Sequence, residues 1–126
     1  MRRFPPVPIR SVHIKHVPIG YCGPFYDVTI DFEPADTEGV TLEIADGVAE
    51  SCPYPEAVAG YFDFLDRGVR EELGRAEHDD VTVAVRVILR RTRVHPVDSS
   101  ELAFQLAGRA ATRKALALAF EPDAAA

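Results

Sequence analysis

Three arginines and one histidine lie close together after the most strongly β-forming run of the chain. They are Arg90, Arg91, Arg93 and His95. A guanidinium group presents several N–H donors in a fixed fork, which matches the oxygens of a phosphate. The residue types therefore suggest contacts to the phosphates of a nucleic acid. The alternative is a solvated turn whose arginines only keep this end of the chain soluble.

The charge of the rest of the chain limits what this basic group can bind. The net charge is −6, and residues 17–89 carry sixteen acidic side chains against four arginines. An acidic protein is a poor general binder of nucleic acid, because affinity for phosphates comes from neutralising cations. A basic end on an acidic body is compatible with contact at one small site, without specificity for DNA.

Catalytic and nucleotide-binding motifs are absent from the sequence. It contains no GxxxxGK[ST], no GxGxxG after a strand, no GxSxG and no HExxH. Ser99 and Ser100 follow His95 and Asp98, which suggests a catalytic triad, but a triad needs the three groups to converge in space. Asp98 and the serines are better suited to capping a helix. We therefore expect no enzymatic activity and no cofactor.

Histidine and cysteine residues give weak signals. His13 and His16 flank a strand without a carboxylate or thiol close by in sequence, so solvated histidines are expected rather than a metal site. Cys22 and Cys52 are too few for a disulfide scaffold and are expected to be structural or incidental thiols. A disulfide or a reactive thiol remains an alternative.

The elements that position the basic group follow from hydrophobic periodicity. Alternation predicts strands at about 9–17, 25–32, 40–45 and 81–89, and helical spacing predicts helices at about 55–75 and 99–119. The second and third strands are expected to form an antiparallel hairpin. The order β-β-β-α-β-α predicts a two-layer α+β sandwich, with both helices on one face of a mainly antiparallel sheet. One domain is expected over residues 1–126, with 1–8 and 121–126 as irregular tails.

The predicted strand from Val81 to Leu89 is apolar on one face and mixed on the other, as expected for a central strand. A turn is predicted over Arg90–Pro96. Asp98, with Glu101 three residues later, resembles a capping box and predicts a helix start. No apolar run approaches the roughly 20 residues of a membrane span. Prolines interrupt the N-terminal segment, so no signal peptide is recognised and a cytoplasmic protein is expected.

The same region resembles domain IV of elongation factor G and its eukaryotic counterpart elongation factor 2. In that family a V-x-V-x-V-x-L strand leads to a tip loop, then to H-x-V-D-S-S-E-M-A-F and a helix continuing I-A-G. The matching residues are His95, Val97, Asp98, Ser99, Ser100, Glu101, Ala103, Phe104, Ala107 and Gly108. A looser resemblance extends over Gly23–Pro34, Gly47-Val48, Arg67–Glu72 and Glu121-Pro122.

The resemblance implies a ribosomal protein S5 domain 2-like fold and contact with the ribosome. In the family this domain reaches the decoding centre, and its tip loops contact tRNA, mRNA and ribosomal RNA. His95 matches the tip histidine that is modified to diphthamide in the eukaryotic factor, and we expect it to be unmodified here. The implied RNA- or ribosome-contacting residues are Arg90, Arg91, Arg93, His95, Gly20 and Gly23.

The sequence departs from the family pattern in ways that affect function. The second tip loop of the family reads S-G-G-R-G-Q, whereas here Pro18–Gly23 lacks the arginine and keeps Gly20 and Gly23. No GTPase domain is present, so the chain is either a stand-alone homologue, which Met1 and the terminal alanines favour, or a fragment. A separate protein partner would then supply a GTPase. The alternative function is a protein-interaction or regulatory module that kept the fold but lost ribosome binding.

Overall fold

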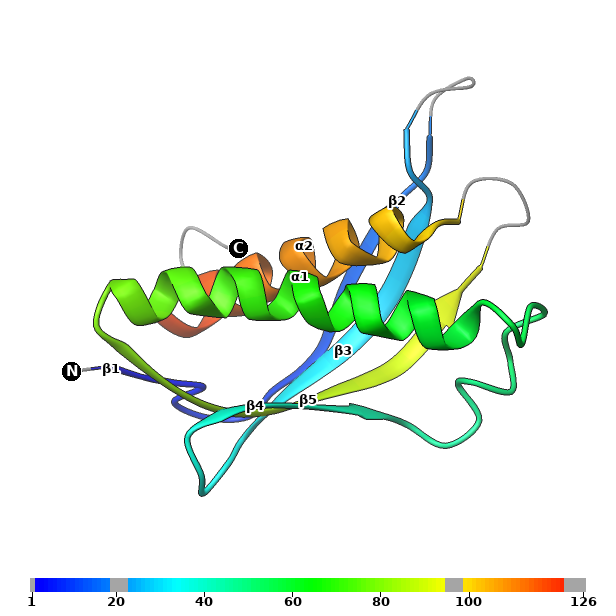
Figure 1. Ribbon diagram of the computed structural model, residues 1–126. Coiled ribbons are helices and arrows are strands. Elements are labelled where there is room, and N and C mark those ends of the chain that lie inside the picture. Colours follow the sequence, from blue (N-terminus) through cyan, green and yellow to red (C-terminus); the bar gives the residue numbers. More distant parts are fainter. Residues whose placement is uncertain (1, 19–22, 95–98, 122–126) are drawn as a thin grey trace.

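A mixed sheet built around one long strand forms one layer of the protein. The computed structural model describes residues 2–18, 23–94 and 99–121 (Figure 1). The central strand β5 (Val81–Arg93) pairs antiparallel with β3 (Tyr26–Pro34), which in turn pairs antiparallel with β2 (Ile9–His16). Two shorter strands, β1 (Arg2–Phe4) and β4 (Gly39–Ile44), run parallel to β5.

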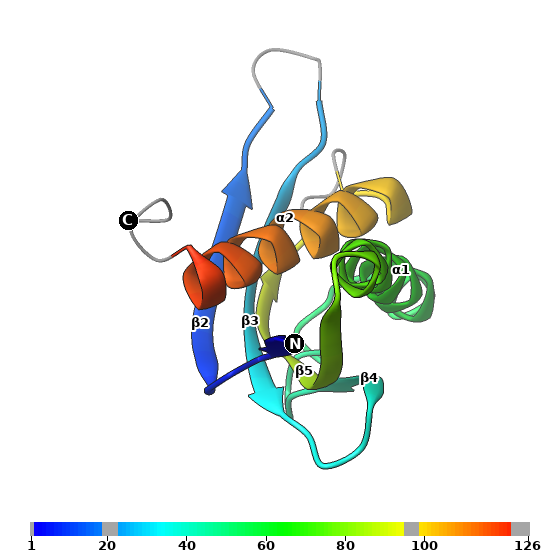
Figure 2. The same ribbon diagram turned by 90° about the vertical axis from the view of Figure 1, so that its left-hand side faces the viewer.

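Two helices form the second layer and cover one face of this sheet. Both α1 (Val58–His78) and α2 (Glu101–Phe120) lie on the same side, as Figures 1 and 2 show. The predicted two-layer α+β sandwich is therefore confirmed. The core between the layers contains large side chains from all the principal elements, including Val28, Ile30, Phe32, Leu65, Leu73, Val85, Leu89 and Phe104. Within the described residues, neither helix is apolar enough over a sufficient length to cross a membrane.

The predicted hairpin between the second and third strands is wrong. β4 pairs with β5 rather than with β3, because β5 occupies the position beside β3. The segment β4-α1-β5 is a parallel βαβ unit, in which the helix carries the chain from one strand to the next. Alternation identifies a strand and its buried face, but it does not identify the neighbour of that strand. The sheet is consequently mixed rather than mainly antiparallel.

The N-terminal tail is also more ordered than predicted. Residues 1–8 were expected to be irregular, yet Arg2–Phe4 forms β1 against the first residues of β5. Phe4 is fully buried, and its ring lies 5.8 Å from that of Phe32. The guanidinium of Arg2 lies 4.6 Å from the ring centre of Phe120, so the tail closes one end of the core. Of the predicted C-terminal tail, residues 122–126 lie outside the described residues.

Two glycines allow the helices to approach closely. A Cβ atom placed on Gly68 of α1 would lie 2.0 Å from the carbonyl oxygen of Gln105. One placed on Gly108 of α2 would lie 2.3 Å from the carbonyl oxygen of Leu65. Several alanines of α2, among them Ala107 and Ala111, are also buried. The alanine-rich helix therefore packs close to its neighbour, as the composition predicts.

A polar contact at the edge of the helix interface makes stability depend on pH. Gln105 and Arg109 of α2 both donate hydrogen bonds to the carboxylate of Glu71 in α1. The hydrogen bond from Arg109, followed by that from Gln105, lowers the pKa of Glu71 below its ordinary value of 4.5. A lowered pKa means that the folded state favours the carboxylate. Its stabilising contribution is complete above the unfolded-state pKa and is lost as the pH falls through the folded-state pKa.

We expect Glu71→Gln to be less stable than the wild type at neutral pH, and the difference to shrink as the pH falls below about 4.5. Urea denaturation at a series of pH values would measure this difference. Glu77→Gln is the matched control, because Glu77 lies exposed on the same helix and makes no side-chain ion pair within the part of the chain that the structure describes. A Glu71→Gln difference that stays constant from neutral to acid pH would contradict the prediction.

Candidate nucleic-acid interface

The three arginines lie on the strand β5 rather than in a turn. The predicted turn over Arg90–Pro96 begins too early, since β5 continues to Arg93 and pairs there with Asp27 of β3. Pairing with β3 extends the strand because β3 supplies a complementary edge beyond the apolar run. His95 and Pro96 fall outside the described residues.

Arg90 forms an ion pair with a neighbouring strand of the sheet. It is the extra residue at a register shift, because Leu89 pairs with Ile30 and Arg91 pairs with Thr29. The Nε atom of Arg90 donates to Oδ2 of Asp31 at 2.7 Å. The carboxylate of Asp31 is nearly buried, whereas about half of the Arg90 side chain is exposed. Arg90 therefore serves first as a structural partner of Asp31.

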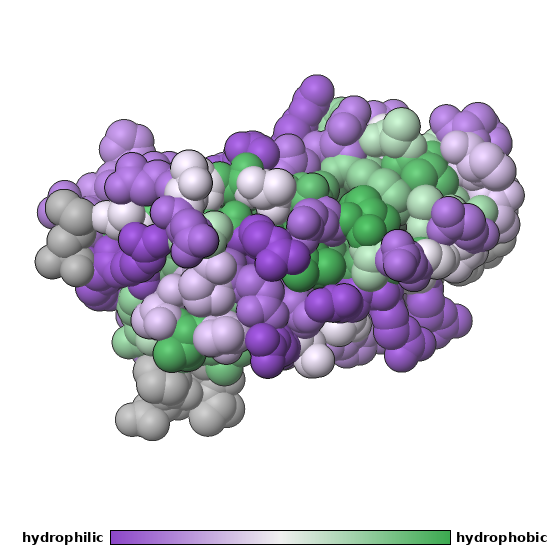
Figure 3. Space-filling model, turned by 90° about the horizontal axis from the view of Figure 1, so that it is seen from below, coloured by the Kyte–Doolittle hydropathy of each residue, from purple (hydrophilic) through white to green (hydrophobic). Residues whose placement is uncertain are grey.

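Other arginines on the open face of the sheet, the face away from the helices, are paired in the same way. Nε of Arg10 lies 2.7 Å from the carboxylate of Glu33, and Arg86 lies 2.8 Å from that of Glu43. The hydrogen bond and charge of each carboxylate raise the pKa of its arginine above the ordinary value. Figure 3 views the molecule from the sheet side and shows that hydrophilic residues cover much of it. Most of this charge is internally compensated.

Arg91 and Arg93 differ from these residues. Within residues 2–18, 23–94 and 99–121, neither has a carboxylate or carbonyl partner for its side chain. They line a hollow of about 280 Å³ on the open face, together with His13, Asp27, Thr29 and Thr92. They are therefore the best candidates among the predicted contact residues for binding an external anion.

The hollow is also lined by residues that the sequence did not indicate as RNA- or ribosome-contacting residues. His13 Nε2 and Asp27 Oδ1 lie 2.7 Å apart across β2 and β3. Thr29 lies between His13 and Arg91 in the register of the three strands. The polar phase of the β3 alternation could have indicated Asp27 and Thr29. Their neighbours on β2 and β5 could not be predicted without the strand order.

The remaining predicted contact residues belong to the segments that connect β2 to β3 and β5 to α2, at the same end of the molecule. The end of β2, the start of β3, the end of β5 and the start of α2 all lie there (Figure 1). Gly23 adopts φ +104°, a left-handed conformation that favours glycine. Its neighbour Pro24 accepts a 2.7 Å hydrogen bond at its carbonyl oxygen from Nδ1 of His16. Gly20 lies outside the described residues.

The start of α2 differs in detail from the predicted capping box. The N-cap is Ser100, whose Oγ accepts a 3.0 Å hydrogen bond from the backbone N–H of Ala103. Glu101 is the first helical residue rather than the third, so the reciprocal glutamate bond is not formed. Asp98 lies outside the described residues. The expectation that a serine caps this helix is confirmed for Ser100.

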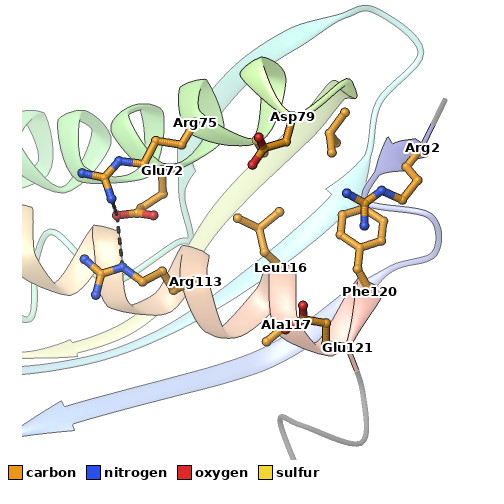
Figure 4. A pocket seen from close by; sticks show the side chains of 11 residues that line it. Arg2, Glu72, Arg75, Asp79, Arg113, Leu116, Ala117, Phe120 and Glu121 are labelled. Carbon is orange, nitrogen blue, oxygen red and sulfur yellow. Dashed lines mark hydrogen bonds and ion pairs between the residues drawn. The ribbon is translucent and has the colours of Figure 1, made fainter.

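A metal-binding cluster or another hollow would be an alternative to this site in the part of the chain that the structure describes. No group of three or more metal-binding side chains is found there. Another hollow, of about 290 Å³, lies between the C-terminal halves of α1 and α2 and β1 (Figure 4). Its cations are already engaged, because Arg75 and Arg113 face the buried carboxylate of Glu72 and Arg2 lies over Phe120. Cys52 is a free, buried thiol, and Cys22 is not described.

Comparison with known proteins agrees with this architecture. A solved crystal structure of a protein from Thermus thermophilus superimposes with a TM-score of 0.58 at 27% sequence identity, over 90% of this chain and 16% of that chain. The present chain thus corresponds to a small part of that protein. The family model for elongation factor G, domain IV, matches residues 8–119. The two-layer fold is that of the ribosomal protein S5 domain 2-like class, and the chain belongs to the elongation factor G domain IV family.

Proposed function

We propose that this protein is a non-catalytic, translation-factor-like module of the cytoplasm that contacts the ribosome or structured RNA through the end of its sheet. The observation that carries the proposal is a contrast among arginines. Arg91 and Arg93 have no carboxylate partner within the described residues, whereas Arg10, Arg86 and Arg90 each have one. A guanidinium group without a carboxylate partner is available to bind a phosphate. In an arginine that is paired with a carboxylate, much of the positive charge is offset and some of the N–H donors are already occupied.

The family membership supports the proposal, because the basic hollow lies where β3 begins and β5 ends, which is the end of the sheet that corresponds to the tip loops in the resemblance. His95, Gly20 and Gly23 are proposed to act beside it, with Arg90 acting mainly through Asp31. If such a module works together with GTP hydrolysis, another domain or protein would provide the GTPase activity. If ribosome binding has been lost, the alternative is a regulatory or protein-binding module with the same fold.

Co-sedimentation with ribosomes at increasing salt tests the proposal. We expect the wild type to pellet with ribosomes at low salt, and Arg91→Ala/Arg93→Ala to remain mostly in the supernatant. Each phosphate contact removed should reduce the salt dependence of binding by about one unit in the log–log slope.

Arg86→Ala is the matched control for this experiment. It removes one cation from the same strand and the same face, but that cation is paired with Glu43. We expect it to pellet like the wild type. If the double variant and the wild type pellet alike, or if the wild type does not pellet at any salt concentration, ribosome contact through this hollow is wrong.

A further inference from the structure

We propose that the open face of the sheet beside the hollow binds the phosphate backbone of base-paired RNA, and that β2 contributes to this surface as well as β5. We call Lys15, Arg91 and Arg93, with the hydroxyl of Thr29 between them, the basic platform. The inference rests on the proposed function and deepens it, because it names the form of the RNA and adds a cation from a third strand.

The register of three strands places these side chains in two adjacent rows. One row runs His13, Thr29, Arg91 across β2, β3 and β5. The next row toward the end of the sheet runs Lys15, Asp27, Arg93. Neighbouring strands lie about 4.8 Å apart, and residues two positions apart along a strand are separated by about 6.6 Å. Arg91 and Arg93 are therefore separated by about 6.6 Å along β5, and Lys15 lies two strand spacings, about 9.6 Å, from Arg93 across Asp27.

The charge of the platform contrasts with that of the remaining open face. Within the described residues, Lys15, Arg91 and Arg93 have no carboxylate partner. Asp27 is the acidic residue of the two rows, and its Oδ1 is already held by His13 at 2.7 Å. Three cations thus face one engaged carboxylate, on a protein whose net charge is −6. A polyanion would be drawn to this region and repelled from the rest of the surface.

The residue types on the platform favour phosphates over bases. The two rows contain cationic, carboxylate, imidazole and hydroxyl groups, without phenylalanine, tyrosine or tryptophan. The tyrosine that precedes them on β3, Tyr26, packs against the core and stacks on His16 at 5.5 Å between ring centres. Proteins that hold unpaired strands stack bases on exposed aromatic rings. Base-paired RNA is instead recognised by its shape and its phosphates and 2′-hydroxyls.

Fluorescence anisotropy with labelled RNA tests the inference. The probes are a fully paired RNA hairpin and a uridine-rich single strand of the same length, titrated with the whole chain over a range of salt concentrations. We expect the hairpin to bind at least as tightly as the single strand, and hairpins of unrelated sequence to bind equally. Lys15→Gln should lower the log–log salt slope by about 1, and Arg91→Gln/Arg93→Gln by about 2.

Two carboxylate-paired arginines provide controls on the same strands. Arg10→Gln on β2 and Arg86→Gln on β5 each remove one positive charge that is held by Glu33 or Glu43. We expect both to bind the hairpin like the wild type. If Arg10→Gln weakens binding as much as Lys15→Gln does, the effect is one of net charge and the platform is wrong. Tighter binding of the single strand would also overturn it.

The remaining outcomes separate this inference from the proposed function. If Lys15→Gln binds the hairpin like the wild type while the double arginine variant does not, the three-strand platform is wrong and contact through Arg91 and Arg93 stands. If the wild type binds the hairpin but does not pellet with ribosomes, the platform stands and ribosome contact fails. If poly-L-glutamate displaces the hairpin as well as heparin does at equal charge, the surface accepts an acidic protein and the inference is overturned.

Discussion

Gly68→Ala and Gly108→Ala are each expected to destabilise the fold severely. The added methyl group would lie 2.0 Å from the backbone oxygen of Gln105 in the first case and 2.3 Å from that of Leu65 in the second. Backbone cannot turn away as a flexible side chain can, so the two helices must separate. Overpacking of a close contact typically costs about 1–3 kcal/mol, and backbone clashes place these variants at or above the upper end. That is a large part of the total stability of a small domain.

Gly74→Ala is the control, since it makes the same chemical change in α1, where no atom lies within 4 Å of the new methyl group. It should stabilise the protein by about 0.5–1 kcal/mol, because alanine loses less backbone entropy in a helix than glycine. Urea denaturation followed by circular dichroism would give all three values. If Gly68→Ala and Gly74→Ala are equally stable, the close helix contact is not present in solution. The double variant Gly68→Ala/Gly108→Ala should cost less than the sum, since one separation of the helices relieves both clashes.

The existence and type of the longer elements could be predicted from the sequence, because burial on one face imposes a period that survives in the residue pattern. The alternate residues of the strand from Val81 to Leu89 and the helical stripe containing Leu65, Val69 and Leu73 are both buried as their spacing predicts. The glycine pair shows the limit of this reasoning. Gly68 indicates an intrinsically weak helix, but its contact with the backbone of Gln105 depends on the crossing point of two helices.

The pairing of the strands could not be predicted from the sequence. β4 was assigned to β3 because they are neighbours in the chain, while the structure inserts β5 between them. The same information decides which of the arginines has a carboxylate partner within the sheet. Arg90, Arg91 and Arg93 are equivalent in composition, and the opposing carboxylate of Asp31 makes Arg90 structural. His13 likewise has an acidic partner, Asp27, that lies fourteen positions away in sequence.

The register of the basic platform in turn depends on two irregularities in the sheet. β2 shifts register between Ile9 and Val12, and β5 contains Arg90 as an extra residue opposite β3. Asp31 joins both. Its Oδ1 accepts from the backbone N–H of Ser11 at 2.7 Å, and its Oδ2 accepts from Nε of Arg90 at 2.7 Å. Ser11 has φ +57°, a conformation that a serine rarely adopts without such support. One carboxylate on β3 therefore stabilises a bulge on each side.

Asp31→Ala is expected to destabilise the protein by about 2–3 kcal/mol, because it leaves a backbone N–H and a partly buried guanidinium without their acceptor. Glu33→Ala is the control. Glu33 lies two residues along the same strand and accepts from the side chain of Arg10, which is 64% exposed, whereas Asp31 also accepts from the backbone N–H of Ser11. Its loss should cost less than about 1 kcal/mol. Equal losses in the two variants, measured by urea denaturation, would contradict a special role of Asp31.

Arg90 and Asp31 should also be coupled energetically and functionally. In a double-mutant cycle, Arg90→Ala and Asp31→Ala together should cost less than their sum, because each already removes their common hydrogen bond. Since Asp31 touches neither Arg91 nor Arg93 in the strand register, any loss of RNA binding in Asp31→Ala reports a displaced platform. Amide hydrogen exchange distinguishes a local displacement of the basic platform from unfolding of the whole domain. Exchange should increase at residues 11–15 and 89–93 and stay near wild type in α1. Uniformly faster exchange would show that Asp31 supports the whole fold instead of the two bulges.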